Sequence, residues 1–358
     1  MKKSLIICSL IAALIFSGCS KNTSSSKTTA TPSATTAQAS SDSSSKKPTY
    51  TWTVAMNVSE ATLNYKMMAK FKELIESKSN GAIKVNLYAN GQLGNDTEQM
   101  QGLIDGSVDF TTTITSGLTS FVKEYGVFDL PNLFPDLTTM RKVLDTKSVL
   151  DELNTYSTAK NVRLMGLADA GFRETTSNKP IHSLDDIAGL KIRVIQNPYH
   201  IAYWKALGAN PLAMDFSEVY IGLQQKTIEA EENPYMNIVA NKFYEVQKYI
   251  VETDHLGHII VFLMNNNLYN GLSDENKKLV NECAEEAVVY TRGLADESIA
   301  GYKKTVEDYG TTIITLDPSV KAAMQDKASG VYDDVRKAIG DKLVDTMLTQ
   351  VKQAKENN

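Results

Sequence analysis

Arginine is the residue type in this chain whose placement most clearly indicates binding chemistry. Arg193 lies in the run Leu190–Val194, where it alternates with Ile192 and Val194 as in a β-strand. Alternation turns its guanidinium away from the apolar face, so the charge needs an anion or water. In a cleft, such a group could hold a carboxylate by two parallel hydrogen bonds that fix position and orientation. A structural salt bridge to one of the chain's many acids is the alternative interpretation.

Arg173 is the second arginine of interest, two residues after Gly171. It could reach a ligand, or it could equally pair with Glu174 or Asp186 at the surface. The residue pattern leaves both interpretations open.

Two further side chains in this stretch could contact a small molecule. Phe216 stands between two polar residues, an exposed position for an aromatic ring unless it packs on a ligand or on a domain core. Asn233, which precedes Pro234, offers a donor and an acceptor on a rigid turn. Core packing for Phe216 and simple turn formation for Asn233 remain alternatives.

Motifs that would indicate an enzyme are missing from the sequence. It contains no G-x-S-x-G, H-E-x-x-H, P-loop or G-x-G-x-x-G pattern. His255 and His258 lie beside Asp254 without a third ligand at recognisable spacing, so hydrogen bonding at a strand edge is favoured over a metal. Cys283 is expected to be a small buried hydrophobe. The sequence therefore predicts neither catalytic residues, nor a metal site, nor a cofactor.

The elements that would position these side chains follow an α/β alternation. A strand–helix–strand–helix–strand order before Gly171 predicts a domain with a largely parallel sheet, and the alternation restarts after it. From Ser273 to Gly310 about 36 residues read as one helix of about 54 Å, long enough to span two domains. The earlier predicted elements are strands at 53–56, 83–87, 108–114 and 163–167 and helices at 63–80, 97–105 and 140–153. Those that follow Gly171 are strands at 190–194, 228–231 and 256–265 and helices at 198–207, 217–225 and 237–243.

Composition excludes several classes of protein. The chain has 358 residues, which favours two cores over one, because single cores stop growing at about 250 to 300 residues. A net charge of −5 argues against binding to nucleic acid, which usually requires a basic surface. Three scattered cysteines exclude a disulfide-stapled scaffold.

The N-terminus is typical of an exported protein. Lys2 and Lys3 precede an apolar stretch of about 18 Å as a helix, too short for a bilayer core of about 30 Å, so residues 1–18 are predicted to be a signal peptide. Ser17-Gly18-Cys19 resembles a bacterial lipobox, which implies lipidation of Cys19; plain secretion is the alternative. The Ser- and Thr-rich residues up to 49 are predicted to form a disordered linker, with folding from about Tyr50.

Five motifs in register between Gly171 and His255 carry a resemblance to a known family. Together they resemble the extracytoplasmic solute receptors of tripartite ATP-independent periplasmic (TRAP) transporters, of the dicarboxylate-receptor type, and the resemblance extends from Tyr50 to about Lys352. The motifs are Gly171-Phe172-Arg173-Glu174-Thr175-Thr176-Ser177-Asn178-Lys179-Pro180-Ile181, Asp185-Asp186-Ile187-Ala188-Gly189-Leu190-Lys191-Ile192-Arg193-Val194, Met214-Asp215-Phe216-Ser217-Glu218-Val219-Tyr220-Ile221-Gly222-Leu223-Gln224, Glu231-Glu232-Asn233-Pro234, and Tyr244-Glu245-Val246-Gln247-Lys248-Tyr249 followed by Thr253-Asp254-His255.

The resemblance implies an α/β, two-domain periplasmic-binding-protein-like fold, with a ligand cleft between the domains and the long helix spanning both. The expected first domain comprises 50–170 plus about 258–297, and the second comprises 171–257 plus about 298–352. It also implies that Arg193 grips the substrate carboxylate, that Arg173 often reaches the ligand, that Phe216 forms a wall of the site and that Asn233 is a polar contact. Asn57 and Thr113 at strand ends, Gln196 and His255 complete the expected site, although a structural role for His255 is equally open. Gln196 and Asn197 depart from the family's usual proline-containing sequence.

The function implied is that of a lipid-anchored, monomeric, extracytoplasmic receptor, not an enzyme. It would capture a small organic acid, close two domains around it and deliver it to TRAP membrane subunits, without a cofactor of its own. Two arginines and the acid-poor strand end at 111–115 suit a sugar acid or a C4 dicarboxylate. Presentation of the same solute to a signalling membrane protein is the alternative, and an extracytoplasmic enzyme on the same scaffold is disfavoured by the missing catalytic motifs.

Overall fold

The first sheet contains the strands predicted before Gly171, together with one strand from much later in the chain. The computed structural model describes residues 48–356. The strand order is β2-β1-β3-β10-β4, with β1, β2 and β3 parallel and β10 antiparallel to both β3 and β4. The prediction of a largely parallel sheet holds for β1, β2, β3 and β4, which all run in one direction, whereas β10 enters from the second sheet and runs against its two neighbours. The bounds are β1 (Tyr50–Ala55), β2 (Ile83–Tyr88), β3 (Phe110–Ile114), β4 (Val162–Phe172) and β10 (Gly257–Asn265).

The second sheet has six short strands in the order β11-β9-β5-β8-β6-β7. Within it β6 is parallel to β7 and β8, β11 is parallel to β9, and β5 is antiparallel to β8 and β9. Four of these strands, β5, β7, β9 and β11, were not predicted. The bounds are β5 (Glu174–Ser177), β6 (Lys191–Val194), β7 (Asn210–Ala213), β8 (Ala230–Asn233), β9 (Tyr249–Glu252) and β11 (Thr312–Thr315).

Most of the predicted helices are present close to their predicted bounds, but one prediction is divided in two and several helices of the structure were not predicted. The single helix predicted over 140–153 is two helices, α4 and α5, separated by the extended backbone of Thr146. Three C-terminal helices were not predicted; of these, α12 contacts η1 and α6, and α13 contacts α4. The shorter and earlier helices are α1 (Leu63–Lys78), α2 (Asp96–Asp105), α3 (Thr115–Leu118), η1 (Lys123–Asp129), α4 (Leu137–Leu144), α5 (Lys147–Thr158), η2 (Leu184–Asp186), α6 (Pro198–Ala206) and η3 (Phe216–Glu218). The remaining ones are α7 (Val219–Gln224), α8 (Tyr235–Ala240), η4 (Phe243–Glu245), α9 (Asn266–Asn270), α10 (Asp274–Tyr309), α11 (Pro318–Lys327), α12 (Gly330–Ile339) and α13 (Asp341–Glu356).

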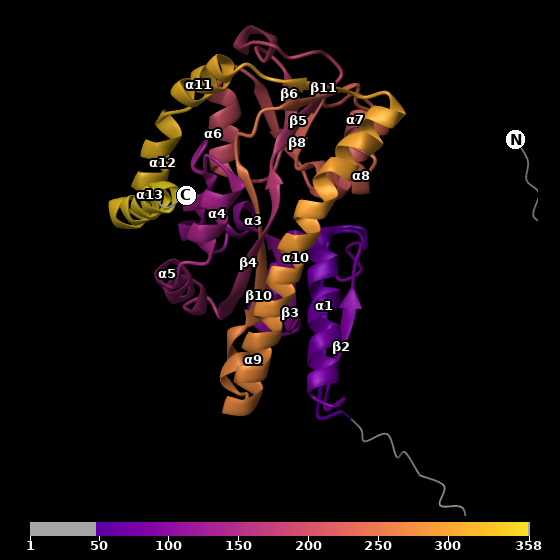
Figure 1. Cartoon of the computed structure of the whole chain (residues 1–358), viewed down its shortest axis with the longest axis vertical. Helices are drawn as coiled ribbons and strands as arrows, with labels where there is room; N and C mark the ends of the chain where they lie inside the picture. Colours follow the sequence, from indigo (N-terminus) through magenta and orange to yellow (C-terminus); the bar gives the residue numbers. More distant parts are fainter. Residues whose placement is uncertain (1–47, 357–358) are drawn as a thin grey trace, which may run out of the picture. The chain divides into compact units, whose positions relative to one another are not determined.

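The long helix α10 has the predicted length and ends. Its 36 residues are capped at the N-terminus by Ser273, whose side chain accepts a hydrogen bond from the backbone N–H of Asn276, 3.2 Å away. Gly310 ends it with a left-handed φ of 104°, which glycine adopts without strain. Along its length α10 first contacts α1 and β4, on the side of the first sheet. It then contacts α8 and β11, on the side of the second sheet (Figure 1).

Two chain segments cross between the sheets beside each other. The chain passes from β4 to β5 through Arg173, and it returns from β9 to β10 through residues 253–256. The backbone N–H of Arg173 donates to the carbonyl of Leu256 at 2.9 Å, so the two crossings are hydrogen-bonded together. Both sheets belong to one compact unit.

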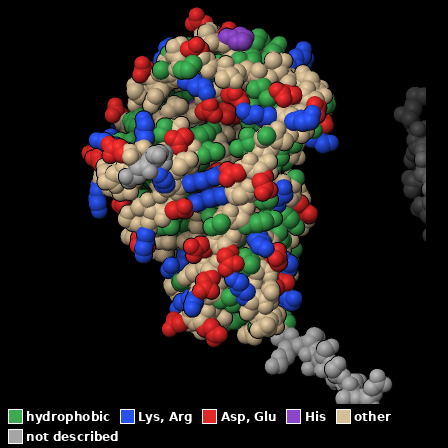
Figure 2. All heavy atoms as spheres, viewed as in Figure 1, with side chains coloured by type: hydrophobic (Ala, Val, Ile, Leu, Met, Phe, Trp, Pro, Cys, Tyr) green, Lys and Arg blue, Asp and Glu red, His purple; other side chains and the backbone are tan. Residues whose placement is uncertain are grey.

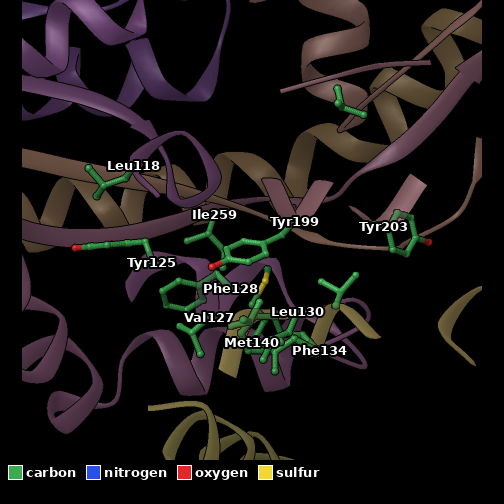
Figure 3. Packing of buried hydrophobic residues seen from close by; sticks show 14 of the residues in the cluster. Leu118, Tyr125, Val127, Phe128, Leu130, Phe134, Met140, Tyr199, Tyr203 and Ile259 are labelled. Carbon is green, nitrogen blue, oxygen red and sulfur yellow. The ribbon is translucent and has the colours of Figure 1, made fainter. Parts of the chain in front are cut away.

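Apolar packing connects α6, beside the second sheet, to η1, which follows the first. Tyr199 of α6 lies close to Phe128 of η1 and Ile259 of β10 in the buried cluster of Figure 3. A Cβ atom at Gly126 would lie 2.4 Å from Cε2 of Tyr199, so only glycine fits beneath that ring. The two halves of the unit therefore share a continuous core.

The surface carries mixed charge, and the export signals fall outside the structure's description. Over the face shown in Figure 2, basic and acidic side chains are interspersed. Among residues 48–356, no helix combines the length and apolar character that crossing a bilayer requires. The predicted signal peptide at 1–18, Cys19 and nearly all of the predicted linker lie outside the described residues. Strand β1 begins at Tyr50, where folding was predicted to start.

Candidate functional site

A cavity lies where strand ends of both sheets meet. Its volume is ≈ 100 Å³, whereas one buried water needs about 10–15 Å³, so it has room for a small molecule. The carboxyl ends of β1 and β3 in the first sheet and of β6, β7 and β8 in the second contribute to its lining, as expected for ligand sites of α/β folds. The lining residues are Val58, Asn64, Asp96, Thr97, Thr112, Thr113, Ile114, Gly117, Ser120, Phe121, Arg173, Arg193, Ile195, Gln196, Met214, Asp215, Phe216, Asn233, Asn237 and His258.

Arg193 is the positive charge of the cavity that lacks a carboxylate partner. The side chain comes from β6 and is 3% exposed. Its Nε and one terminal nitrogen donate to the backbone carbonyl of Met214, at 3.0 and 2.7 Å. No carboxylate of the described residues forms an ion pair with it. Burial lowers the pKa of the guanidinium to about 10, against the opposing charge of Glu232, so it remains protonated at neutral pH.

An aromatic ring and a polar pair stand beside Arg193. The guanidinium carbon lies 5.8 Å from the ring centroid of Phe216, within the range of a cation–π interaction. Phe216 in turn packs edge-on against Phe243, with centroids 6.0 Å apart, so its position is fixed from behind. Gln196 donates its amide to Oδ1 of Asp215 at 3.0 Å. Phe216, Gln196 and Arg193 therefore share one wall of the cavity.

Arg173, by contrast, is nearly saturated by partners inside the protein. It forms an ion pair with the Glu232 carboxylate, in which one terminal nitrogen lies 3.0 Å from Oε1, and it also donates to the Glu232 backbone carbonyl. Its other terminal nitrogen lies 2.7 Å from Nδ1 of His258. Because arginine can only donate, this nitrogen of His258 accepts, and the ring proton is on Nε2. Neither surface pairing expected from the sequence, with Glu174 or Asp186, is formed.

Behind the cavity, Glu232 is the centre of a buried polar cluster. Its carboxylate oxygens lie 3.2 Å from Nε2 of His255 and 3.4 Å from Nδ1 of His200, in addition to their contact with Arg173. Nε2 of His200 lies 3.2 Å from Oδ1 of Asp129, at the end of η1. The cluster thus joins β8 and α6, on the side of the second sheet, to η1 on the side of the first.

The protonation states in this cluster follow from opposing effects. Burial by itself would raise the pKa of Glu232, but the charge of Arg173 and hydrogen bonds from the two histidines outweigh it and hold that pKa well below its usual value. Burial, reinforced by the nearby charge of Arg173, keeps the pKa of His258 well below its usual value. Burial also lowers the pKa of His200, yet hydrogen bonds to Asp129 and Glu232 outweigh it, and the net shift is upward.

Asn233 lies at the end of β8 and is held by two side chains. Its amide nitrogen donates to Oε2 of Glu231 at 2.6 Å, and its oxygen accepts from Asn237 at 2.9 Å. Glu231 also accepts from Thr176 at 3.0 Å. Burial raises the pKa of Glu231 to about 7, despite these hydrogen bonds.

The wall from the side of the first sheet is uncharged at β3, but it carries an acid at α2. Thr112 and Thr113 line the cavity from β3, and Asn64 of α1 donates to the Thr112 hydroxyl at 3.2 Å. Asp96, at the start of α2, accepts from the amide of Asn57 at 3.1 Å. Asn57 itself is not part of the lining; it contacts the cavity through Asp96.

The structure brings together most, but not all, of the side chains predicted for the site. Arg193, Arg173, Phe216, Asn233, Thr113 and Gln196 line the cavity, whereas Asn57 and His255 do not. His255 is fully buried and stacks on the ring of Tyr203, with ring centroids 5.3 Å apart. Its Nδ1 is hydrogen-bonded to the hydroxyl of Thr253 at 2.9 Å. Its place in the structure is therefore within the cluster behind the cavity.

Several lining residues were missed by the sequence analysis, chiefly Asp96, Asp215, Asn237 and His258. Two of them had a signal that was available. Asp215 directly precedes Phe216 in a motif already singled out, and Asn237 lies one helical turn after Asn233. Nothing in the sequence pattern distinguished Asp96 from the other acids.

Metal binding is not indicated by the arrangement of side chains. Among residues 48–356, no group of three or more His, Cys, Asp and Glu side chains is placed to hold a metal ion. Cys283 is buried with a free thiol, and burial raises its pKa to about 11, so it is a poor nucleophile.

Comparison with protein families gives one match that covers most of the chain. Residues 54–338 match the family described as bacterial extracellular solute-binding protein, family 7. The 2,3-diketo-L-gulonate-binding periplasmic protein of Escherichia coli K12 is 32% identical over 247 residues, covering 69% of this chain and 75% of that protein.

Solved structures of similar fold include two with different bound acids. The sugar acid binding protein of Advenella mimigardefordensis in complex with galactonate has a TM-score of 0.80 and 30% identity, covering 85% of this chain and 98% of that one. A TRAP periplasmic solute binding protein from Sulfurospirillum deleyianum with bound succinate has a TM-score of 0.79 and 32% identity, covering 84% and 99%. The two-domain α/β fold predicted from the sequence is thereby confirmed, as is the family resemblance.

Proposed function

The chain belongs to family 7 of the bacterial extracellular solute-binding proteins, and we propose that it captures a small organic acid through an ion pair between Arg193 and the ligand's carboxylate. The ligand class is that of sugar acids or C4-dicarboxylates. Proteins similar to this chain bind 2,3-diketo-L-gulonate, galactonate and succinate, all of which carry at least one carboxylate.

The observation that carries this proposal is the state of Arg193. A guanidinium that is 3% exposed and hydrogen-bonded only to a backbone carbonyl is a buried charge without an ion-pair partner among the described residues. A carboxylate that entered the cavity would supply the missing charge and could accept two parallel hydrogen bonds. Phe216 beside the guanidinium would exclude water and so strengthen the pair.

Binding is proposed to close two domains around the ligand. Side chains from both sheets line the cavity, so a ligand can make contacts in a closed state that it cannot make in an open one. Ligand favours the closed state only by the free energy of these additional contacts. The domains we propose are 50–170 with about 258–297, and 171–257 with about 298–352, connected at Arg173, residues 253–256 and α10.

The receptor is further proposed to be a lipoprotein that delivers its ligand to TRAP membrane subunits. Family membership supports the extracytoplasmic location, and the Ser17-Gly18-Cys19 sequence supports lipidation at Cys19. In cells fed labelled palmitate, the protein should take up label and fractionate with membranes, and Cys19→Ser should lose both properties. Label on the Cys19→Ser variant would contradict the proposal.

Titration calorimetry with galactonate and succinate tests the ion pair. We expect Arg193→Ala to weaken whichever acid binds by about 3 kcal/mol or more, about a hundredfold, because a buried charge pair loses one member. Arg193→Lys should fall between Ala and wild type, since lysine keeps the charge but not the planar fork.

Arg336→Ala is the matched control for this experiment. Arg336 lies on α12 and pairs with Asp341 and Asp345, away from the cavity lining, so its removal should leave affinity unchanged. Equal affinities for wild type and Arg193→Ala would remove Arg193 from the site and overturn the proposed function.

A further inference from the structure

The cavity is lined by Arg193, which suits an anion, and also by three hydrogen-bond acceptors that each have an oxygen without a partner among the described residues. They are the carboxylates of Asp96 and Asp215 and the amide oxygen of Asn237. Asp96 belongs to α2, Asp215 to the segment between β7 and η3, and Asn237 to α8. An anion receptor has no evident use for two further carboxylates beside its ligand, so their presence requires an explanation.

Each of the three has an oxygen that the protein does not use. Asp96 accepts from Asn57 through Oδ2 alone, and Asp215 accepts from Gln196 through Oδ1 alone. Asn237 is 6% exposed, and its Oδ1 is buried without a hydrogen-bond partner among the described residues. Buried acceptors are normally paired, because an unpaired one keeps the cost of leaving water. The pattern therefore points to donors that arrive with the ligand.

The electrostatic environment of these acceptors disfavours a second negative charge. Burial raises the pKa of Asp96, a hydrogen bond from Asn57 and the charge of Arg193 oppose this, and the charge of Asp215 raises it further. Asp96 and Asp215 thus already repel each other across the cavity. A second ligand carboxylate placed near them would add to this repulsion and could not donate a hydrogen bond.

From this geometry we infer that the cavity selects a polyhydroxylated monocarboxylate, a sugar acid, over a dicarboxylate. Arg193 holds the single carboxylate, and ligand hydroxyls donate to Asp96, Asp215 and Asn237. The inference rests on the proposed function, because it takes the Arg193–carboxylate pair as given. It adds to that function the chemical feature that decides between the two ligand classes.

An ammonium group could also satisfy a carboxylate, but it fits this arrangement less well. The three acceptors come from three separate elements, so the donors must be distributed along the ligand. A sugar acid carries hydroxyls on successive carbons, whereas an ammonium concentrates its donors on one atom. An ammonium would in addition be repelled by the charge of Arg193, which acts on Asp96.

A calorimetric panel tests the inference on the purified protein. The sugar acids are galactonate, gluconate, galacturonate and glucuronate; the dicarboxylates are succinate and fumarate; 4-aminobutyrate represents an ammonium-bearing acid. We expect the tightest sugar acid to bind at least about 100-fold more tightly than either dicarboxylate and than 4-aminobutyrate, because hydroxyls on successive carbons can donate to both carboxylates, whereas a dicarboxylate has no donor there and an ammonium has its donors on one atom.

Asp96→Asn and Asp215→Asn then test which groups cause the preference. Each variant keeps the shape of the side chain but removes a charge and one acceptor, so the ratio of sugar-acid to succinate affinity should fall by about 10-fold or more. Asp105→Asn, at an exposed position near the end of the same helix as Asp96, is the matched control and should leave the ratio unchanged. Melting temperatures of all variants establish that they fold.

The possible outcomes separate this inference from the proposed function. If succinate or fumarate bound most tightly, or if 4-aminobutyrate did, the inference would be overturned while the role of Arg193 could stand. An unchanged affinity ratio in both Asp variants would overturn it as well. If no acid bound, or if Arg193→Ala left the affinity for the acids that bind unchanged, the proposed function itself would fail.

Discussion

Arg173 and Arg193 are two buried arginines of the same cavity that differ in how their charge is compensated. Arg173 is 2% exposed and its donors are engaged by Glu232 and His258, whereas Arg193 is 3% exposed and donates only to a backbone carbonyl. Equal burial therefore does not mean an equal role. We therefore propose that Arg173, whose charge is paired inside the protein, stabilises the connection between the sheets, and that Arg193, which has no ion pair among the described residues, binds the ligand.

Two consecutive carboxylates on β8 also differ in whether a charged partner lies beside them. Glu232 points into the cluster behind the cavity, where Arg173 and two histidines keep it ionised. Glu231 points to the other face of the strand, where its partners are the uncharged Thr176 and Asn233 and its pKa rises to about 7. Because neighbouring residues of a strand face opposite ways, one step in sequence separates a structural ion pair from a titratable group.

The largest expected effect comes from breaking the cluster at its centre. Glu232→Ala should lower the free energy of unfolding by about 3–5 kcal/mol, because it leaves the buried charge of Arg173 without its partner. Chemical denaturation monitored by circular dichroism measures this loss.

Glu229→Ala provides the comparison within the same segment of chain. Glu229 pairs with Lys179, whose side chain is 70% exposed, and such pairs contribute about 0–1 kcal/mol. Similar losses for the two variants would mean that the buried cluster has no special structural role.

Substitution of the two arginines should have opposite consequences. Arg173→Ala should mainly lower stability, whereas Arg193→Ala should mainly weaken ligand binding. Arg173→Ala should cost about 3 kcal/mol or more of stability, because Glu232 is left as an uncompensated buried charge. Arg193→Ala should change stability by about 1 kcal/mol or less, since no ion pair is broken and only the hydrogen bonds to the Met214 carbonyl and the contact with the Phe216 ring are lost. Urea titration of both variants checks this, and a greater stability loss for Arg193→Ala would reverse the assignment of roles.

A smaller effect is expected in the pH dependence of stability. The folded-state pKa of Glu231, about 7, lies above the value of 4.5 for a free glutamate, so the folded protein binds its proton more tightly than the unfolded chain. In the wild type, the contribution of Glu231 to the free energy of unfolding is present in full below pH 4.5 and is lost as pH rises toward 7. The loss is at most about 1.4 kcal/mol for each unit by which folding raises the pKa. Glu231→Gln should therefore gain stability relative to wild type over that interval, as measured by denaturation at a series of pH values. A difference that stayed constant with pH would contradict the raised pKa.

The smallest effect is expected at the aromatic neighbour of Arg193. Phe216→Leu keeps an apolar side chain against Phe243 but removes the ring face at 5.8 Å from the guanidinium. Ligand affinity should fall by about 0.5–1 kcal/mol, about two- to fivefold, in calorimetry with the tightest acid. Phe243→Leu, one layer further from the cavity, should alter affinity less; the reverse order would mean that Phe216 acts through packing alone.

Strong local patterns account for the elements that were predicted from the sequence, although one element with such a pattern was missed. The 36-residue helix α10 was predicted because its capping serine, its terminal glycine and the absence of proline are all local signals. Strand β5 was missed because its four residues, Glu174–Ser177, are polar and yet all buried, so hydrophobic alternation gives no indication of them. Helix α13 was missed although its apolar residues do recur at helical spacing.

The residues of the candidate site likewise include some that could be predicted from the sequence and some that could not. Arg193, Phe216 and Asn233 stand out in sequence because their types are unusual for their predicted surroundings, and all three line the cavity. His255 was expected at the site because of the motif that contains it, yet it is His258 that lines the cavity. Asn57 was expected to face a ligand from a strand end, and instead it holds Asp96, which does line the cavity.

The sequence by itself determined the family, the α/β alternation, the long helix and the presence of two noteworthy arginines, because each depends on local spacing or on motifs in order. Only the tertiary structure decided which arginine is compensated, because Glu232 reaches Arg173 across 59 positions of the chain. Only the tertiary structure, likewise, brought Asp96 and Asp215 to the cavity beside Arg193, since these three residues come from α2, from the segment after β7 and from β6. Compensation of a charge is a property of its surroundings in space, and residue type alone does not carry it.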